Sequence, residues 1–257
     1  PHSAVSDAEA TADLLNDLLK RVQELPTLTL EKITQLKLNL PQQTAWVFDA
    51  ELQRRRKSSQ PLSEELYVSH GIVLHKSRPI TANSQREKHK YPSTKKAKEK
   101  LYGDTLRLRP VQAKMMNSIY NNYTHDEPKN MIVEAGTGVG KTLGYLFPLS
   151  YVAYPDKKIV VSTATNILQQ QIIDTSIAQL NKVLPFKMNS VIIKGNAHYI
   201  DIARFVHSLS VIEDSKLVQL LKAKILVWLL STQSGDLDEL NLNSQQSPYF
   251  TEISHQG

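Results

Sequence analysis

The stretch "IVEAGTGVGKTLGYL", residues 132–146, decides the fold because it sets a glycine-rich loop between two apolar segments. Ala135 is followed by four positions and then by Gly140-Lys141-Thr142, which is the spacing of a phosphate-binding loop. Glycines let the backbone wrap with its N–H groups inward, and a following helix presents its positive end to a phosphate. The stretch predicts a nucleoside-triphosphate site, with a plain strand–helix turn as the alternative.

The residues of this loop have separate expected tasks. Lys141 would reach the β- and γ-phosphates of ATP and Thr142 would bind Mg²⁺, so both are catalytic candidates. Upstream, Gln112 can pair with the N6 donor and N7 acceptor of adenine, although it could also be a polar residue at a helix start. The expected ATP-binding residues are Arg109, Gln112, Ala135, Gly136, Thr137, Gly138, Val139, Gly140, Lys141 and Thr142.

A second polar stretch, "STATNILQQQ" at 162–171, begins where another apolar segment ends. Its hydroxyl and amide groups can donate to phosphate oxygens without reading bases. Ordinary helix capping by Thr165 or Asn166 is the alternative. The residues expected to contact a DNA backbone are Ser162, Thr163, Thr165, Asn166, Gln169 and Lys194.

Apolar segments alternate with helical patterns through the middle of the chain. Strands are expected at 130–135, 157–165 and 187–195, and a helix is expected from about 140 to 152. Such alternation with apolar strands predicts an α/β class with a parallel sheet covered on both faces. Outside it we expect helices at 8–25, 29–38, 43–57, 107–123 and over most of 197–231, a short hairpin or bent strand at 65–76, and a short helix within 234–240. In the helix at 107–123, the inward side is predicted to carry Val111, Met115, Ile119 and Tyr123.

Charge is concentrated in one tract. Residues 86–100 hold seven basic and two acidic side chains, a surplus of +5 within a net charge of +6. The pI of 9.3 therefore reports a local feature. We expect an exposed linker over 78–100, with DNA contact by the tract as the less favoured alternative.

Several classes are excluded or disfavoured by composition. The chain has no Cys, which excludes disulfides and cysteine-ligated iron–sulfur clusters. The longest apolar run, residues 225–230, is too short to cross a bilayer, and no signal peptide is visible. A cytoplasmic protein with no membrane partner is expected.

Four stretches together resemble the DinG helicase family, superfamily-two relatives of XPD. They are "EAGTGVGKTLGYLFP" (134–148), "STATNILQQQI" (162–172), "IIKGNAHYI" (192–200) and "GDLDELN" (235–241). The resemblance covers 105–257 and implies a partial RecA-like motor domain of an ATP-dependent DNA helicase, with ATP and Mg²⁺ as cofactors and single-stranded or partly duplex DNA as partner. XPD-like helicases usually carry a cluster-ligating Cys where Asp201 stands here, so no iron–sulfur cluster is expected.

The first residues resemble a second family. "HSAVSDAEAT" (2–11) is similar to the last motif of DnaQ-like (DEDDh) 3′–5′ exonucleases. The resemblance makes His2 a general base and Asp7 the ligand of one catalytic metal, in a site incomplete here; a helix N-terminus with Asp7 as cap is the alternative. The combined order resembles the fused exonuclease–helicase DinG proteins of Gram-positive bacteria.

This resemblance implies a division of the chain. The expected parts are an exonuclease C-terminal helix at 1–25, a mostly helical connector at 26–104, the first part of motor domain 1 at 105–196, and a helical insertion at 197–257. The polar start without Met and the open end predict an internal fragment. It lacks an Asp-Glu pair ending an apolar strand and is expected to be inactive alone. The alternatives are another P-loop class, such as a small-molecule kinase or a transport ATPase, and a scaffold with a dead loop; the oligomeric state is left open.

Overall fold

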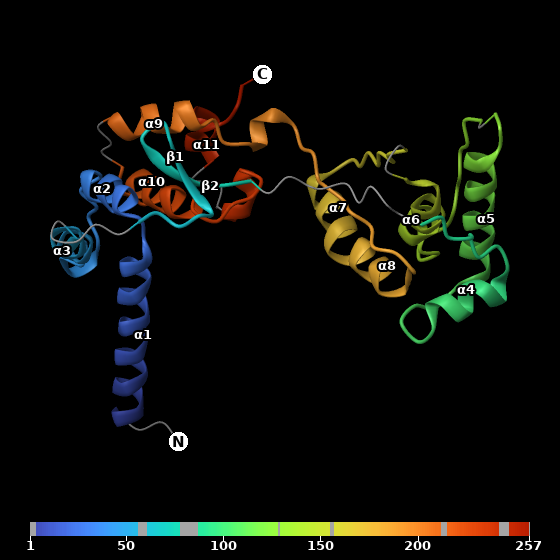
Figure 1. The fold of residues 1–257 in the computed structure, drawn as a ribbon, viewed down its shortest axis with the longest axis horizontal. Coiled ribbons are helices and arrows are strands. Elements are labelled where there is room, and N and C mark those ends of the chain that lie inside the picture. The colour runs from blue at the N-terminus through green and yellow to red at the C-terminus, as the bar shows by residue number, and fades with distance from the viewer. Residues whose placement is uncertain are drawn as a thin grey trace. The chain divides into compact units, whose positions relative to one another are not determined.

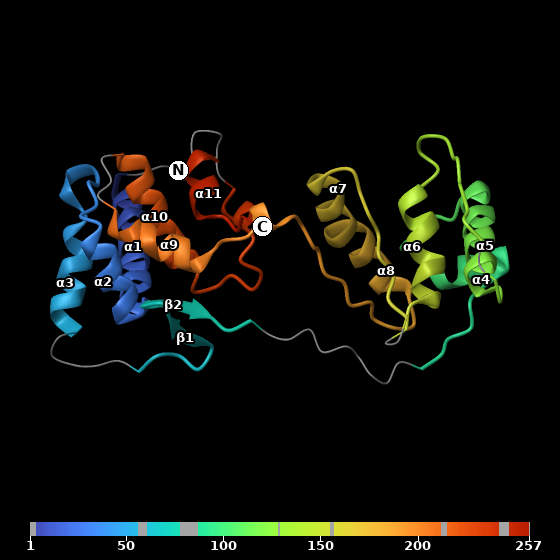
Figure 2. The ribbon, with the colours of Figure 1, turned by 90° about the horizontal axis from the view of Figure 1, so that it is seen from above.

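The computed structural model divides the chain into two compact units. It describes residues 4–55, 61–77, 87–127, 129–154, 157–211, 215–241 and 247–256. Unit 1 comprises Pro1–Pro79 together with Gly195–Gly257, and unit 2 comprises Ile80–Lys194. Along the sequence, unit 2 is therefore inserted into unit 1. The colours of Figures 1 and 2 follow this order from the N-terminus to the C-terminus.

Unit 1 is mainly helical, as the sequence predicts. Its elements are α1 (Ala4–Glu24), α2 (Thr27–Gln35), η1 (Pro41–Gln43), α3 (Trp46–Arg55), β1 (Leu66–Ser69), β2 (Ile72–His75), η3 (Asn196–His198), α9 (Ile202–Ser210), α10 (Lys216–Trp228), η4 (Leu237–Leu240) and α11 (Ser247–Ile253). The helices expected at 8–25, 29–38 and 43–57, the hairpin and the helical stretch after 197 are confirmed, with ends shifted by a few residues.

The hairpin of unit 1 forms at a tight turn. β1 pairs antiparallel with β2, and the turn residues His70 and Gly71 both have positive φ, 50° and 74°. Two left-handed residues give the primed turn whose twist suits a two-residue hairpin loop. β2 packs inward, and His75 N donates to Leu229 O at 2.9 Å, which ties the hairpin to the end of α10.

One core joins the early and late parts of unit 1. Ile33 of α2 and Ile72 of β2 belong to the same buried cluster as Phe205, Ile225 and Ile253. The described residues of 26–77 and 195–256 thus share a core, although the sequence-based division assigned these ranges to different parts. Sequence distance does not reveal this, because helices separated by an inserted unit can still bury their apolar faces together.

The end of α1 is attached by a buried arginine of α3. The guanidinium of Arg55 donates to the carbonyl oxygens of Gln23 and Leu25, and its Nε donates to Glu51 Oε1 at 2.7 Å. Hydrogen bonds from Arg54, with a further contribution from Arg55, lower the pKa of Glu51 to about 2. The rest of α1 extends away from the other helices of unit 1 in Figure 1, and no α1 residue is buried.

Unit 2 is also built from helices. They are α4 (Lys95–Tyr102), α5 (Pro110–Thr124), α6 (Lys141–Val152), α7 (Asn166–Gln171), the π-helical η2 (Ile172–Ile177) and α8 (Ala178–Val183). Its core gathers Tyr102, Met116, Phe147 and Leu180. The helix from about 140 to 152 is confirmed as α6.

The buried face of α5 agrees with the predicted one at Ile119 and differs from it at Val111 and Tyr123. Met116 and Ile119 are buried with Gln112, whereas Val111 is 60% exposed and Tyr123 is exposed as well. The two faces are one residue apart around the helix, and both carry apolar side chains at helical spacing. Packing against α6 selects the face that carries Gln112.

The expected parallel sheet is not confirmed. Within the described residues the named strands are β1 and β2 alone, and both belong to unit 1. The segments at 130–135, 157–165 and 187–195 form no ladder, and they leave Ile132 99%, Val160 90% and Ile193 78% exposed. An apolar run shows only that a segment suits the interior of a sheet. The neighbouring strands that pair with it and the helices that cover it are other segments of the chain.

The predicted exposed linker is wrong for its second half. Residues 95–102 form α4, capped by Thr94, whose Oγ1 accepts from Ala97 N at 3.2 Å. Lys98 is fully buried: its Nζ donates to the carbonyls of Pro92 and Ser93 and to Asn117 Oδ1, and lies 4.7 Å from the Tyr91 ring centroid. A lysine whose ammonium finds such acceptors can enter a core, which a count of charges does not anticipate. Residues 78–86 of the expected linker lie outside the described residues.

Among the described helices, none combines the length and the apolarity that a membrane crossing requires.

Candidate nucleotide-binding site

The glycine-rich loop curls directly in front of a helix. Gly138 and Gly140 have left-handed φ angles of 77° and 84°, and α6 begins at Lys141. A Cβ atom on Gly136 or Gly138 would meet nothing within 4 Å, so the outer side of the loop is open. An exposed, curled loop at a helix N-terminus is the geometry in which backbone N–H groups and the helix dipole face an anion. The predicted loop–helix arrangement is confirmed, while its ligand stays a prediction.

The two residues expected at the phosphates lie on the first turn of α6. Lys141 Nζ donates to Ala135 O at 2.8 Å and to Gly136 O at 3.5 Å, so the ammonium lies over the loop that it follows. The Lys141 side chain is exposed, and a rotation about its own bonds releases it from these carbonyls. Thr142 is half-buried beside Tyr145, and the Thr142 hydroxyl opposes the rise in the Tyr145 pKa that burial causes.

Gln112 lies against the loop from inside. It is 3% exposed, its Nε2 donates to Gly140 O at 2.9 Å, and its buried Oε1 has no hydrogen-bond partner. A Cβ atom on Gly140 would overlap Gln112 Nε2, so this glycine is required both by its φ angle and by the glutamine. Arg109, by contrast, is exposed at the start of α5. The structure thus joins Gln112 to the loop backbone, and adenine recognition by Gln112 stays a prediction.

The polar stretch 162–171 forms the entrance to α7. Thr165 caps this helix by accepting from Leu168 N at 3.3 Å, which confirms the capping interpretation, and Thr163 Oγ1 donates to Thr165 O. Gln169 Nε2 donates to Ile193 O at 3.4 Å, which brings the residue before Lys194 beside this helix. Ser162 and Asn166 are exposed. The structure therefore gathers most of the expected DNA-contacting residues at one place, although it does not test the contact.

The helix that follows holds a feature that the sequence does not reveal. Ile172–Ile177 is π-helical, and it lies between the α-helical segments α7 and α8. The apolar spacing of Ile173, Ile177, Leu180 and Leu184 predicts one regular helix, so no sequence signal marks the change of winding. Single π turns inside helices are frequent at functional sites.

Of the two expected exonuclease residues, the structure describes Asp7 alone. His2 lies outside the described residues. Asp7 is exposed in the first turn of α1, which begins at Ala4, so Asp7 is not the cap of this helix. Asp201 stands where XPD-like helicases usually carry a cluster-ligating Cys. Its side chain caps α9 by accepting a hydrogen bond from Arg204 N at 3.1 Å.

Comparison with known proteins gives a consistent result. The family model described as "DEAD/DEAH box helicase" matches residues 109–240. A "3'-5' exonuclease DinG" of Bacillus subtilis (strain 168) is 29% identical over 249 residues, which cover 95% of this chain and 26% of that protein. The protein of the same name from Staphylococcus aureus (strain bovine RF122 / ET3-1) is 30% identical over 254 residues, 97% of this chain and 27% of that protein. The chain thus spans about a quarter of the length of these relatives, and no solved structure matches it.

Proposed function

Because the chain belongs to the DEAD/DEAH box helicase family, we propose that unit 2 binds MgATP and single-stranded DNA as part of an ATP-dependent DNA helicase motor. The observation that carries this proposal is the glycine loop curled at the N-terminus of α6, with Lys141 on its rim and Gln112 bonded to its last carbonyl. A turn without a nucleotide function requires neither the lysine nor the glutamine.

The residues present suit a magnesium triphosphate. In the proposed complex Lys141 would leave the carbonyl of Ala135 and hold the β- and γ-phosphates, and the Thr142 hydroxyl would be a ligand of Mg²⁺. Gln112 has a buried amide oxygen still to be satisfied, and its movement toward adenine would release Gly140. ATP supplies the free energy of phosphoanhydride hydrolysis to the motor.

Single-stranded DNA is proposed to lie along the entrance of α7. Thr163, Thr165 and Gln169 are held there by local hydrogen bonds, and Lys194 adds a positive charge. These groups can hold phosphates of any sequence, as a motor that travels along a strand requires. The same proposal includes partly duplex DNA as a further partner. It also includes a RecA-like parallel sheet as the fold of the motor domain and the cytoplasm as its location.

For the longer protein we propose the architecture that the relatives' printed names suggest, a helicase joined to a 3′–5′ exonuclease. In this proposal α1 ends the exonuclease part, with His2 and Asp7 in its last motif. The exposed apolar side chains Leu14 and Leu18 of α1 suit a helix covered by another domain.

The test is nucleotide binding by the 257-residue chain. A fluorescent ATP analogue with Mg²⁺ is titrated into the wild type, Lys141→Ala and the control Lys114→Ala, whose lysine is exposed on α5. Lys141→Ala is expected to weaken binding at least tenfold, because a charge-assisted contact to phosphate is lost. Equal affinity of the two variants would contradict the proposed site.

A second titration separates the helicase proposal from other P-loop classes. Fluorescence anisotropy of a labelled oligothymidine is measured with the same chain at rising salt, and Lys194→Ala is compared with Lys114→Ala. Binding that weakens with salt, and weakens further in Lys194→Ala, is the expected result. A chain that binds nucleotide without binding the oligonucleotide would favour a small-molecule kinase or a transport ATPase.

A further inference from the structure

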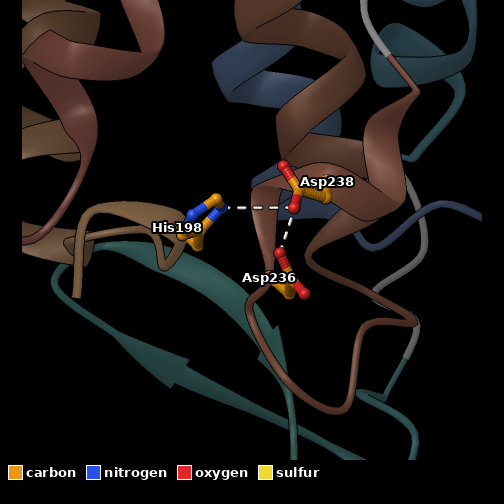
Figure 3. A group of neighbouring side chains, drawn as sticks. All are labelled: His198, Asp236 and Asp238. Atoms are coloured by element: carbon orange, nitrogen blue, oxygen red, sulfur yellow. Dashed lines mark hydrogen bonds and ion pairs between the residues drawn. The ribbon is translucent and has the colours of Figure 1, made fainter. Parts of the chain in front are cut away.

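Three potential metal ligands meet in unit 1. His198 ends η3, Asp236 caps η4, and Asp238 lies in the first turn of η4. Each offers one ligand atom, and these atoms all lie within 4.8 Å of one another. Figure 3 shows Asp238 between the imidazole of His198 and the carboxylate of Asp236. Among the described residues this is the one such group of three.

The backbone holds the two contributing segments together. Tyr199 and Asp236 form an antiparallel bridge, and Ile200 N donates to Gly235 O at 3.0 Å. Asp236 Oδ1 also accepts from Asp238 N at 3.0 Å, which fixes the orientation of that carboxylate. Residues far apart in the chain are therefore placed by the fold before any ion arrives, which lowers the entropic cost of binding one.

The spacing of one donor pair suits a small divalent cation, and all three ligand atoms lie within 4.8 Å of one another. His198 Nδ1 and Asp238 Oδ2 are 3.2 Å apart. Two donors that each lie about 2.0–2.1 Å from one tetrahedral zinc ion are separated by about 3.3 Å. Asp236 is 9% exposed, while the side chains of His198 and Asp238 are open to solvent at 35% and 48%. An ion can therefore reach the site from solvent, and the site is partly buried on the side of Asp236.

The chemistry of the donors narrows the choice of cation. Mg²⁺ and Ca²⁺ favour sites made of oxygen ligands, whereas an imidazole nitrogen beside carboxylates suits first-row metals such as Zn²⁺. We propose that His198, Asp236 and Asp238 bind one Zn²⁺ ion that clamps η3 to η4, with water completing the coordination. The clamp would give a role to His198 of "IIKGNAHYI" and to Asp236 and Asp238 of "GDLDELN", residues to which the sequence analysis gave none.

The test measures zinc binding by the whole 257-residue chain after EDTA treatment and removal of the chelator. Calorimetry with ZnCl₂ and metal analysis after gel filtration are applied to wild type, His198→Gln and Asp238→Asn. His207→Gln, an exposed histidine of α9, is the matched control. We expect about one equivalent bound by the wild type and by the control, and at least tenfold weaker binding by each site variant.

Thermal unfolding supplies the second readout. Zn²⁺ is expected to raise the midpoint of unfolding of the wild type and of His207→Gln but not of His198→Gln, and Mg²⁺ at the same concentration is expected to have no such effect. The contact between His198 and Asp238 also fits a simple ion pair. Zinc affinities of His198→Gln and Asp238→Asn equal to that of the control, or no bound zinc in the wild type, would establish the ion pair and overturn the metal site.

Discussion

At the scale of the residue, Gly140 is where backbone conformation and the proposed chemistry meet. Its φ of 84° lies in the left-handed region, and its carbonyl accepts the hydrogen bond of Gln112. Gly136 lies in the same loop without either constraint, because a Cβ atom there would meet nothing within 4 Å. Alanine substitutions at these two glycines therefore separate the effect of strain at position 140 from the general effect of replacing a loop glycine.

We predict that Gly140→Ala lowers the free energy of unfolding by about 1–3 kcal/mol, whereas Gly136→Ala stays within about 1 kcal/mol of the wild type. The alanine at 140 must adopt a strained φ and displace the amide of Gln112. Urea unfolding of the two variants and the wild type checks the difference. Equal stability of the two variants would show that the loop relaxes freely.

At the scale of the element, α4 is a helix organised around a buried cation. Lys98 Nζ reaches two carbonyls that precede the helix and the side chain of Asn117 on α5. Burial lowers the pKa of Lys98 to about 8 from 10.5. Helix α4 thus depends on Lys98, which donates hydrogen bonds to the backbone carbonyls just before the helix and also links α4 to α5.

This depressed pKa predicts a pH dependence with a definite sign. From about pH 8 upward the folded state releases the Lys98 proton while the unfolded state keeps it until about 10.5, so stability rises with pH in this window. The usable range is pH 8 to about 10, because buried tyrosines such as Tyr102 have raised pKa values and ionise first in the unfolded state. Urea unfolding at pH 7.5, 8.5 and 9.5 measures the slope. Lys98→Met should lower stability overall and flatten the slope, and an unchanged slope would rule out Lys98 as its source.

At the scale of the whole molecule, the described residues form two buried hydrophobic clusters. The cluster containing Phe205 is made of unit 1 residues, and the cluster containing Phe147 is made of unit 2 residues. Separate cores are expected to unfold as separate cooperative units. The proposed nucleotide site and the proposed zinc site lie in different units, so each can be perturbed independently.

We predict that Phe205→Ala and Phe147→Ala each lower the free energy of unfolding by about 3–5 kcal/mol. The loss is expected only in the unit that contains the substituted residue. Both side chains are fully buried, so each substitution leaves a cavity. Amide hydrogen exchange followed by mass spectrometry reports the two units separately. Faster exchange throughout both units in either variant would indicate one cooperative molecule.

The sequence by itself determined the features that depend on neighbouring residues. It located the glycine loop and the start of α6, most helices and the hairpin, because caps, turns and periodic apolar positions act over a few residues. It also led to the helicase family through the same local motifs. Residues such as Lys141, Thr142 and Gln112 could be named from their spacing alone.

Only the tertiary structure decided what depends on distant segments. It selected the α5 face that carries Gln112, buried Lys98 and joined the two parts of unit 1 around Phe205. It also brought His198 to Asp236 and Asp238. The physical reason is that burial, cross-chain hydrogen bonds and ligand clusters are properties of pairs of segments, so an apolar or charged pattern fits several partners until packing chooses one.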